Sequence, residues 1–270
     1  MTLGERYDEI ADAYARWWAP VLSTSARSLL DRIAHAVART PAATILDLGT
    51  GTGTVASAAL ARWPEVRLIA VDSSARMLAL AQLSASGAPD RFSTVQADAA
   101  DLPLEDASVD AVTSSFVVQL VDARRALAEA RRVLRPDGTL AIVTWVGPDA
   151  SFEPDLTLDD ALDELGIDVP EDEEEDDETP GHFAAASELV DVVRATGFRD
   201  VEADEGMLVH GFNAATYGQF LEEYGERALF ESISPADARR LRRLTERYLR
   251  DLEPDQFLWQ TPIVTVTARR

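Results

Sequence analysis

The chain has 270 residues, 46% of them hydrophobic, with no cysteine and only three histidines. This composition allows a large core, excludes disulfides, cysteine-based zinc sites and a cysteine nucleophile, and leads us to expect no metal site. The formal net charge of −23 opposes binding to a phosphate backbone, so we expect no nucleic-acid partner. No apolar run reaches the roughly 20 residues that span a membrane, and the first residues do not resemble a secretion signal, so we expect a cytoplasmic protein.

Residues 5–38 have apolar residues at helical spacing, and we expect Pro20 and Ser23 to divide this stretch into two helices. After residue 43, short apolar strands alternate with helices as far as Trp145. This alternation predicts parallel strand pairing and an α/β fold with a doubly wound sheet, because a crossover between parallel strands needs a helix. The expected strands are 43–48, 66–71, 93–97, 109–116 and 139–144, and the expected helices are 55–61, 75–83 and 123–134.

The alternation stops after Trp145. Residues 146–182 contain one short helical pattern, which Gly166 ends, and then eight consecutive acidic residues at 171–178, which we expect to be solvated. The remaining pattern predicts helices at 188–196 and 214–224, a helix that begins at Pro235, and strands within 201–212 and 257–267.

The most informative stretch is the glycine-rich loop after the first expected strand, Asp47-Leu48-Gly49-Thr50-Gly51-Thr52-Gly53. Glycines allow a sharp turn and let a ligand lie against the main chain, and the next helix begins beside it. The dinucleotide fingerprint G-x-G-x-x-G fails from Gly49, because Thr54 stands at its last position. It fits from Gly51 if Ala56 replaces the last glycine, so the loop is compatible with two classes of cofactor.

Acidic residues follow the next two expected strands. Asp72 ends the strand at 66–71, and an acid about 20 residues past such a loop is placed to accept both hydroxyls of a ribose. Asp98 follows the strand at 93–97. Because open α/β sheets bind ligands at the carboxyl ends of their strands, Asp47, Asp72 and Asp98 indicate one ligand site.

These residues resemble a known family. The pattern Asp47-x-Gly49-x-Gly51-x-Gly53, with Asp72 and Asp98, is similar to the cofactor motifs of class I S-adenosylmethionine-dependent methyltransferases. Tyr7-Asp8-x-x-Ala11-x-x-Tyr14 and residues 106–145 resemble the small-molecule branch that includes quinone-biosynthesis methyltransferases. The resemblance implies a Rossmann-like methyltransferase fold with a seven-stranded, mostly parallel sheet in the order 3-2-1-4-5-7-6, helical lid insertions, and methyl transfer from S-adenosylmethionine to a small molecule.

The resemblance also implies roles for individual residues. Asp72 would accept the ribose hydroxyls, Asp98 would accept the adenine amino group, and Met77 would pack against adenine. The expected cofactor-binding residues are Tyr14, Asp47, Gly49, Thr50, Gly51, Asp72, Ser73, Met77, Asp98, Ala99, Ser115 and Gln119. On the acceptor side we expect Tyr7, Trp18, Trp145, Phe183 and Tyr217, with His182 as the candidate general base because it follows the acidic insertion.

We therefore predict a single methyltransferase domain over residues 1–270. Residues 1–40 would form an N-terminal helical cover, 146–182 an acidic insertion or lid, and 212–254 a helical insertion on the acceptor side. Aromatic and aliphatic residues in the insertions indicate an apolar or aromatic acceptor. The alternatives are a nicotinamide-dependent oxidoreductase and a non-catalytic, cofactor-binding regulatory subunit, and we expect a monomer or a homodimer.

Overall fold

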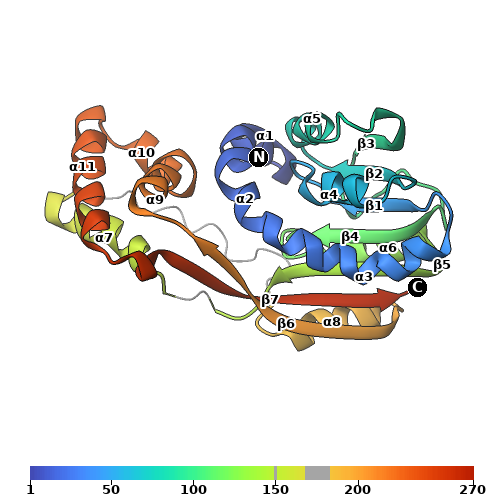
Figure 1. Ribbon diagram of the computed structural model, residues 1–270. Coiled ribbons are helices and arrows are strands. Elements are labelled where there is room, and N and C mark those ends of the chain that lie inside the picture. The colour runs from blue at the N-terminus through green and yellow to red at the C-terminus, as the bar shows by residue number, and fades with distance from the viewer. Residues whose placement is uncertain (149–150, 168–182) are drawn as a thin grey trace. The chain divides into compact units, whose positions relative to one another are not determined.

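The computed structural model describes residues 1–148, 151–167 and 183–270 (Figure 1). These residues divide into two units. The described residues of unit 1 are 1–148, 183–206 and 262–270, and those of unit 2 are 151–167 and 207–261. The sequence predicted one domain with insertions at 146–182 and 212–254. The described parts of these two insertions make up most of unit 2. The acidic run at 171–178 lies outside the described residues.

Unit 1 is built on a sheet that has seven strands in the described part of the chain, in the order β3-β2-β1-β4-β5-β7-β6. The pairs formed among β1 to β5 are parallel, and β7 runs antiparallel to β5. This order and the mostly parallel pairing confirm the prediction. The strands are β1 (Thr44–Leu48), β2 (Arg67–Asp72), β3 (Phe92–Gln96), β4 (Val109–Ser115), β5 (Leu134–Trp145), β6 (Arg199–Gly211) and β7 (Leu258–Arg269).

Helices cover both faces of this sheet, which explains why its central strands are almost continuously apolar. Along β1, Leu46 and Leu48 pack in one core cluster with α6 (Ala123–Val133) and α8 (Ala186–Ala195). The helices α3 (Ala26–Arg39), α4 (Thr54–Arg62) and α5 (Ala75–Ser84) contribute no residue to that cluster and instead contact one another and the strands (Figure 1). The charged side chain of Asp47 is the exception in β1, and it is fully buried.

The N-terminal region is helical but irregular. Helix α1 (Leu3–Ala13) continues into a π-helical segment (Tyr14–Trp18), a short helix α2 (Ala19–Leu22) and a 3-10 turn (Ser23–Ser25) before α3 begins. At Ser23, where the sequence predicted a break, the helix type changes to a 3-10 turn, and Pro20 lies in the first turn of α2. Helix α1 packs against α5.

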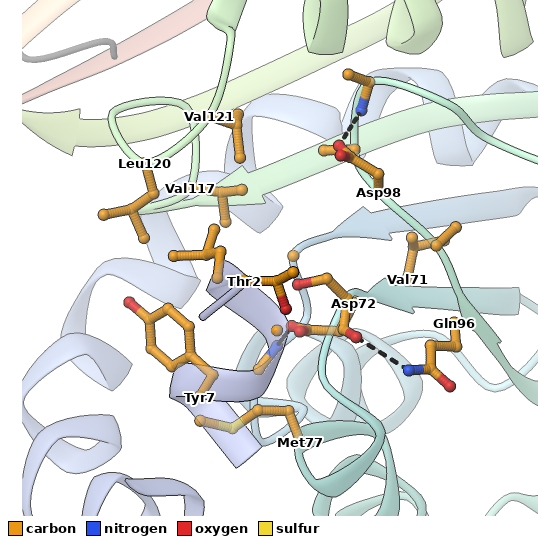
Figure 2. Close-up of a pocket in the computed structure, with 18 of the residues that line it drawn as sticks. Thr2, Tyr7, Val71, Asp72, Met77, Gln96, Asp98, Val117, Leu120 and Val121 are labelled. Carbon is orange, nitrogen blue, oxygen red and sulfur yellow. Dashed lines mark hydrogen bonds between the residues drawn. The ribbon is translucent and has the colours of Figure 1, made fainter. Parts of the chain in front are cut away.

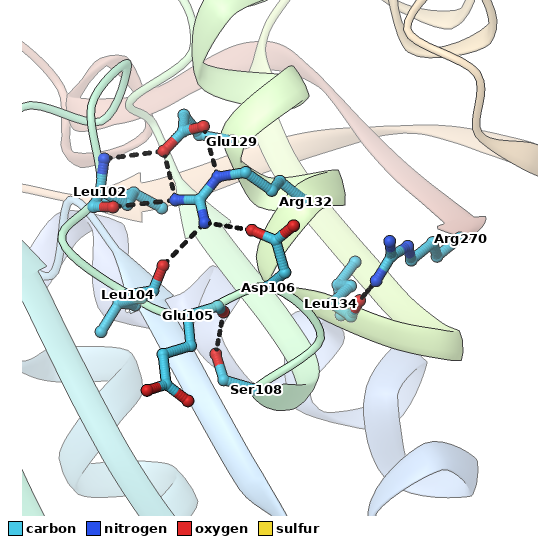
Figure 3. Close-up of polar contacts among 9 residues, drawn as sticks. All are labelled: Leu102, Leu104, Glu105, Asp106, Ser108, Glu129, Arg132, Leu134 and Arg270. Atoms are coloured by element: carbon cyan, nitrogen blue, oxygen red, sulfur yellow. Dashed lines mark hydrogen bonds and ion pairs between the residues drawn. The ribbon is translucent and has the colours of Figure 1, made fainter.

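Arg132 of α6 anchors the loop that joins β3 to β4 (Figure 3). Its guanidinium donates to the carbonyl oxygens of Leu102 at 2.8 Å and Leu104 at 2.7 Å, and to the carboxylate of Asp106 at 2.7 Å. Glu129 accepts from the same guanidinium and from the Leu102 amide, and the bond from Arg132 lowers the pKa of Glu129. The loop that starts at the end of β3 is thus held rigidly to α6.

Unit 2 is a small helical unit. Helix α11 (Pro235–Asp251) packs against α7 (Glu153–Leu165) and α9 (Ala214–Phe220), and α10 (Arg227–Ser232) follows a π-helical segment at Leu221–Gly225. Helix α11 begins at Pro235, as the sequence predicts, and Ser234 caps it by accepting a hydrogen bond from the Asp237 amide. In the part of the chain that the structure describes, no helix is both long and apolar enough to cross a membrane.

Candidate functional site

A cavity of about 500 Å³ lies in unit 1 beside the carboxyl ends of β1, β2, β3 and β4 (Figure 2). The order of the sheet reverses between β1 and β4, and open α/β sheets bind ligands at this point. The wall is built from the loops that follow the four strands and from the start of α1. Its volume is in the range of sites that hold a small molecule.

Two of the loop glycines are required by close packing. Gly49 has a φ of +67°, and a Cβ atom there would lie 2.2 Å from Cγ2 of Val117. Gly53 has a φ of +82°, and its Cβ would lie 2.9 Å from Cα of Ala81 in α5. Gly49 therefore lets the loop after β4 close against the glycine-rich loop, and Gly53 lets α5 approach the start of α4.

Asp72, at the end of β2, ties the glycine-rich loop to the next strand. Its Oδ2 accepts from the Gly51 amide at 2.8 Å, and its Oδ1 accepts from the Ser74 amide at 2.9 Å. Burial raises the pKa of Asp72, and these backbone hydrogen bonds oppose the increase. A carboxylate offers about four acceptor positions, so Asp72 keeps capacity for ligand hydroxyls in the cavity.

Asp47 lies behind the same loop, in the middle of the sheet. Its carboxylate accepts from the hydroxyls of Thr50 at 2.7 Å and Thr113 at 2.8 Å, and no ion pair to it occurs among the described residues. Burial raises the pKa of Asp47 to about 6, against the effect of those hydroxyls and of the Ala56 amide. Asp47 lines a second cavity of about 30 Å³, which shares Gly49 and Gly51 with the first.

The main cavity combines apolar walls with polar ends. Asp98 is exposed at its edge, and its Oδ1 accepts from the Ala100 amide at 2.8 Å. Met77 of α5 is buried and contributes to the wall near Asp72 (Figure 2). The other apolar wall residues drawn with labels in Figure 2 are Val71, Val117, Leu120 and Val121.

Three aromatic rings extend from the cavity along the ends of β4 and β5; we call Phe116, Trp145 and Trp18 the aromatic row. Phe116 lines the cavity, and its ring centroid lies 4.0 Å from that of Trp145, which lies 6.3 Å from that of Trp18. Phe116 has a φ of +55°, a rare and strained conformation for a bulky residue. Its amide is held by the Val143 carbonyl at 2.8 Å. Such strain persists where surrounding contacts enforce it, often at functional sites.

Comparison with known proteins finds a family model that matches this strand–loop–helix region. Residues 46–142 match the methyltransferase domain family, and we refer to them as the methyltransferase domain. The match begins in β1 and ends in β5, so it includes the glycine-rich loop, Asp72, Asp98 and the loop after β4.

The methyltransferase domain has similar sequences among named enzymes. The chain is 41% identical to a demethylmenaquinone methyltransferase of Clavibacter sepedonicus over 145 residues, which is 53% of this chain and 57% of that enzyme. It is 40% identical to a malonyl-[acyl-carrier protein] O-methyltransferase of Methylococcus capsulatus over 106 residues, which is 39% of this chain and 38% of that enzyme. In both cases the match covers less than two thirds of the relative's length.

Solved structures share the fold. The YcgJ protein of Bacillus subtilis is similar with a TM-score of 0.58 and 20% identity, over 90% of this chain and 98% of that one. Phosphoethanolamine N-methyltransferase 2 of Haemonchus contortus, solved with S-adenosyl-L-methionine, is similar with a TM-score of 0.54 and 19% identity, over 92% of this chain and 52% of that one. The predicted Rossmann-like methyltransferase fold is confirmed.

Most of the residues predicted to bind a cofactor lie around one space in the methyltransferase domain and its N-terminal helix. Asp47 and Thr50 line the smaller cavity. Trp18 and Trp145 belong to the aromatic row beside Phe116. The predicted residues that line the main cavity are Tyr7, Tyr14, Gly49, Gly51, Asp72, Ser73, Met77, Asp98, Ala99 and Ser115.

Gln119 does not lie where the resemblance places it. Its side chain is buried, and its Oε1 accepts from Oγ1 of Thr144 in β5 at 2.7 Å instead of lining the main cavity. The Leu120 amide donates to the Val117 carbonyl at 2.8 Å and closes a tight turn. Within this turn the side chain of Gln119 reaches Thr144 and not the cavity. Val117, Leu120 and Val121 therefore form the wall in place of Gln119.

Phe183 and Tyr217, expected on the acceptor side, are used for packing. Phe183 is 4% exposed and belongs to the core cluster beneath α8. Tyr217 lies in an aromatic cluster of unit 2, 5.3 Å from the ring of Phe152, and its hydroxyl donates to Asp155. Neither residue lines the main cavity. His182, the candidate general base, lies outside the described residues.

The start of α1 forms a cavity wall that the sequence analysis did not include. Thr2, Leu3, Gly4 and Glu5 all line the main cavity. Thr2 and Glu5 form a capping box, in which Thr2 Oγ1 accepts from the Glu5 amide at 3.2 Å and Glu5 Oε2 accepts from the Thr2 amide at 2.7 Å. The T-x-x-E pattern is typical of a helix start. Only the packing of α1 shows that this helix start borders the cavity.

Proposed function

We propose that this chain transfers a methyl group from S-adenosylmethionine to a small molecule. The observation that carries the proposal is the cavity in the methyltransferase domain, which brings the glycine-rich loop, Asp72 and Asp98 together. The names of the relatives, a demethylmenaquinone methyltransferase and a malonyl-[acyl-carrier protein] O-methyltransferase, support the same activity.

The residues around the cavity fit the nucleoside half of this cofactor. Asp72 has acceptor capacity for the two ribose hydroxyls, and Asp98 can accept from an exocyclic amino group. Met77 and Val117 provide apolar surface for an adenine ring. On the methionine side, the buried carboxylate of Asp47 has no ion pair among the described residues, and a cationic ligand nearby would favour its ionised form.

S-adenosylmethionine supplies a methyl group that its sulfonium sulfur has already activated. The residues of the chain must then align the acceptor with that methyl group and exclude water, and alignment of this kind contributes about 7–11 kcal/mol in the best cases. The strained Phe116 and the loop after β4 are suited to this, because both are fixed by packing against β5 and the glycine-rich loop. A general base is needed only when the acceptor must lose a proton.

We propose further that the acceptor is apolar or aromatic. The aromatic row offers ring faces next to the cavity, and Tyr7 and Tyr14 contribute two more rings, 5.9 Å apart and edge to face. Replacing Trp145 with leucine should raise the KM for an aromatic acceptor about 2- to 10-fold and leave cofactor affinity unchanged. Trp63→Leu is the control, because Trp63 stacks with Arg62 outside the cavity.

Calorimetry of the whole chain tests the proposal. Titration with S-adenosylhomocysteine should give binding at one site, and titration with NAD should give none. Transfer of a labelled methyl group to a panel of phenols, quinones and amines then tests catalysis. Binding of the nicotinamide cofactor without binding of S-adenosylhomocysteine would falsify the proposal, and cofactor binding without turnover on any acceptor would favour the regulatory subunit.

A further inference from the structure

Asp8 of α1 caps a helix to which it does not belong. Its Oδ1 accepts from Oγ of Ser74 at 2.5 Å and from the Arg76 amide at 2.9 Å. Ser74 is the N-cap of α5, and the Arg76 amide is one of the first-turn amides that no carbonyl of α5 can satisfy. A carboxylate is favoured at this end of a helix, and the two bonds hold the pKa of Asp8 below its usual value.

Ser74 connects Asp8 to two side chains that face the cavity. Its amide donates to Oδ1 of Asp72 at 2.9 Å, and its hydroxyl oxygen accepts from the Met77 amide at 3.0 Å. The same hydroxyl donates its hydrogen bond to Asp8. Ser74 itself is completely buried, whereas Asp8 is exposed and reaches it from the surface. Asp8 therefore determines the orientation of the hydroxyl that fixes the start of α5.

Helix α1 is in direct contact with this loop. A Cβ atom on Gly4 would lie 2.8 Å from the Ser73 carbonyl oxygen, so the backbones of α1 and of the loop after β2 touch. Asp8, Tyr7 and Ser73 all line the main cavity. A change in the distance between α1 and the loop would therefore change the cavity wall and the position of Asp72 together.

Asp12, one turn further along α1, offers a matched comparison. Both of its carboxylate oxygens accept from the Arg76 guanidinium at 2.9 Å, so it also joins α1 to α5. This pair is largely exposed, Asp12 does not line the cavity, and neither partner atom belongs to the loop of Ser74. Exposed ion pairs of this kind contribute little to stability.

We propose that Asp8 is a positioning residue for the nucleoside half of the cofactor. It acts through Ser74, which holds the Asp72 carboxylate where it meets the ribose and holds Met77 where it meets the adenine. The inference rests on the proposed function, because it assumes that the ligand contains an adenosine.

The test compares Asp8→Asn with Asp12→Asn in the full chain. Affinities are measured by calorimetry for S-adenosylhomocysteine and for 5′-methylthioadenosine, which keeps the nucleoside and lacks the amino-acid end. Asp8→Asn should weaken both ligands by the same factor, about tenfold, since a hydrogen bond to a charged group is replaced by one to a neutral amide. Asp12→Asn should change either affinity less than about twofold.

A double-mutant cycle with Ser74→Ala separates positioning from loss of structure. If Asp8 acts through Ser74, the double variant should bind both ligands no more weakly than Ser74→Ala alone. Additive losses, or a loss for Asp8→Asn that is no larger than for Asp12→Asn, would overturn the inference. A loss of affinity by Asp8→Asn that affects S-adenosylhomocysteine alone would also overturn the inference. If the unaltered chain binds neither ligand, the proposed function fails as well; if it binds both and Asp8→Asn binds equally well, only this inference fails.

Discussion

Gly49 and Val117 approach so closely that a methyl group on Gly49 would lie 2.2 Å from Cγ2 of Val117. The two residues lie in the loops that follow β1 and β4, on either side of the point where the order of the sheet reverses. This contact brings the glycine-rich loop and the loop after β4 to the same cavity. It makes Gly49 a structural requirement of the cavity as well as a part of its wall.

Gly49→Ala should therefore destabilise the protein. The added methyl group overpacks against Val117, which typically costs about 1–3 kcal/mol, and a residue with a side chain is also strained at this positive φ. Gly87→Ala is the control, since nothing lies within 4 Å of a Cβ there. Urea unfolding should separate the two variants clearly, and equal midpoints would contradict the packing that we describe.

Asp72→Ala should weaken the binding of S-adenosylhomocysteine by about 1–3 kcal/mol, because it removes the carboxylate that we propose accepts the ribose hydroxyls. Calorimetry measures the change. Asp90→Ala, an exposed acid in the turn before β3, should leave the affinity unaltered. Unchanged binding by Asp72→Ala would mean that the ligand does not use the end of β2.

Asp47→Asn should stabilise the ligand-free protein at pH 7. Burial raises the pKa of Asp47 to about 6, above the unfolded value of about 3.9, so the folded state opposes its ionisation. Two pKa units correspond to roughly 3 kcal/mol, which sets an upper estimate of the gain. The cost of the ionised form is present at pH 7 and is relieved as the pH falls through 6 toward 4, where the folded state binds the proton.

The difference in unfolding free energy between Asp47→Asn and the unaltered chain should thus shrink between pH 7 and pH 4. Urea titrations at several pH values measure it, with Asp90→Asn as the exposed control. The same variant should bind S-adenosylhomocysteine less tightly, if Asp47 interacts with the ammonium end of the ligand. A variant less stable than the unaltered chain at pH 7 would show that the Thr50 and Thr113 hydroxyls outweigh the cost of burial.

Phe116→Gly should be more stable than Phe116→Ala by about 1 kcal/mol, because only glycine adopts the φ of +55° without strain. Both variants lose the packing of the ring on Trp145. At Val112, buried in the extended strand β4, the order should be reversed, with alanine more stable than glycine by about 0.5–1 kcal/mol. The same order at both positions would argue against the strained turn after β4.

Most of the residues that the sequence marked as a cofactor site line one cavity, because they follow a simple rule. Gly51, Asp72 and Asp98 each lie at or shortly after the end of a strand, and neighbouring parallel strands bring such residues to one edge of the sheet. Gln119 was misplaced because its orientation depends on a tight turn and on Thr144, a residue of another strand. Phe183 looked like a pocket residue by its type, and only the core beneath α8 shows where it packs.

By itself, the sequence determined the α/β class, the order of its elements and the acids that end successive strands, since periodicity and turn residues act over short distances along the chain. The tertiary structure decided which side chains share the cavity. Asp8 reaches Ser74 across 66 residues, and Phe116 stacks on Trp145 from a neighbouring strand. Contacts between segments so far apart depend on packing in three dimensions, and that packing leaves no local pattern in the sequence.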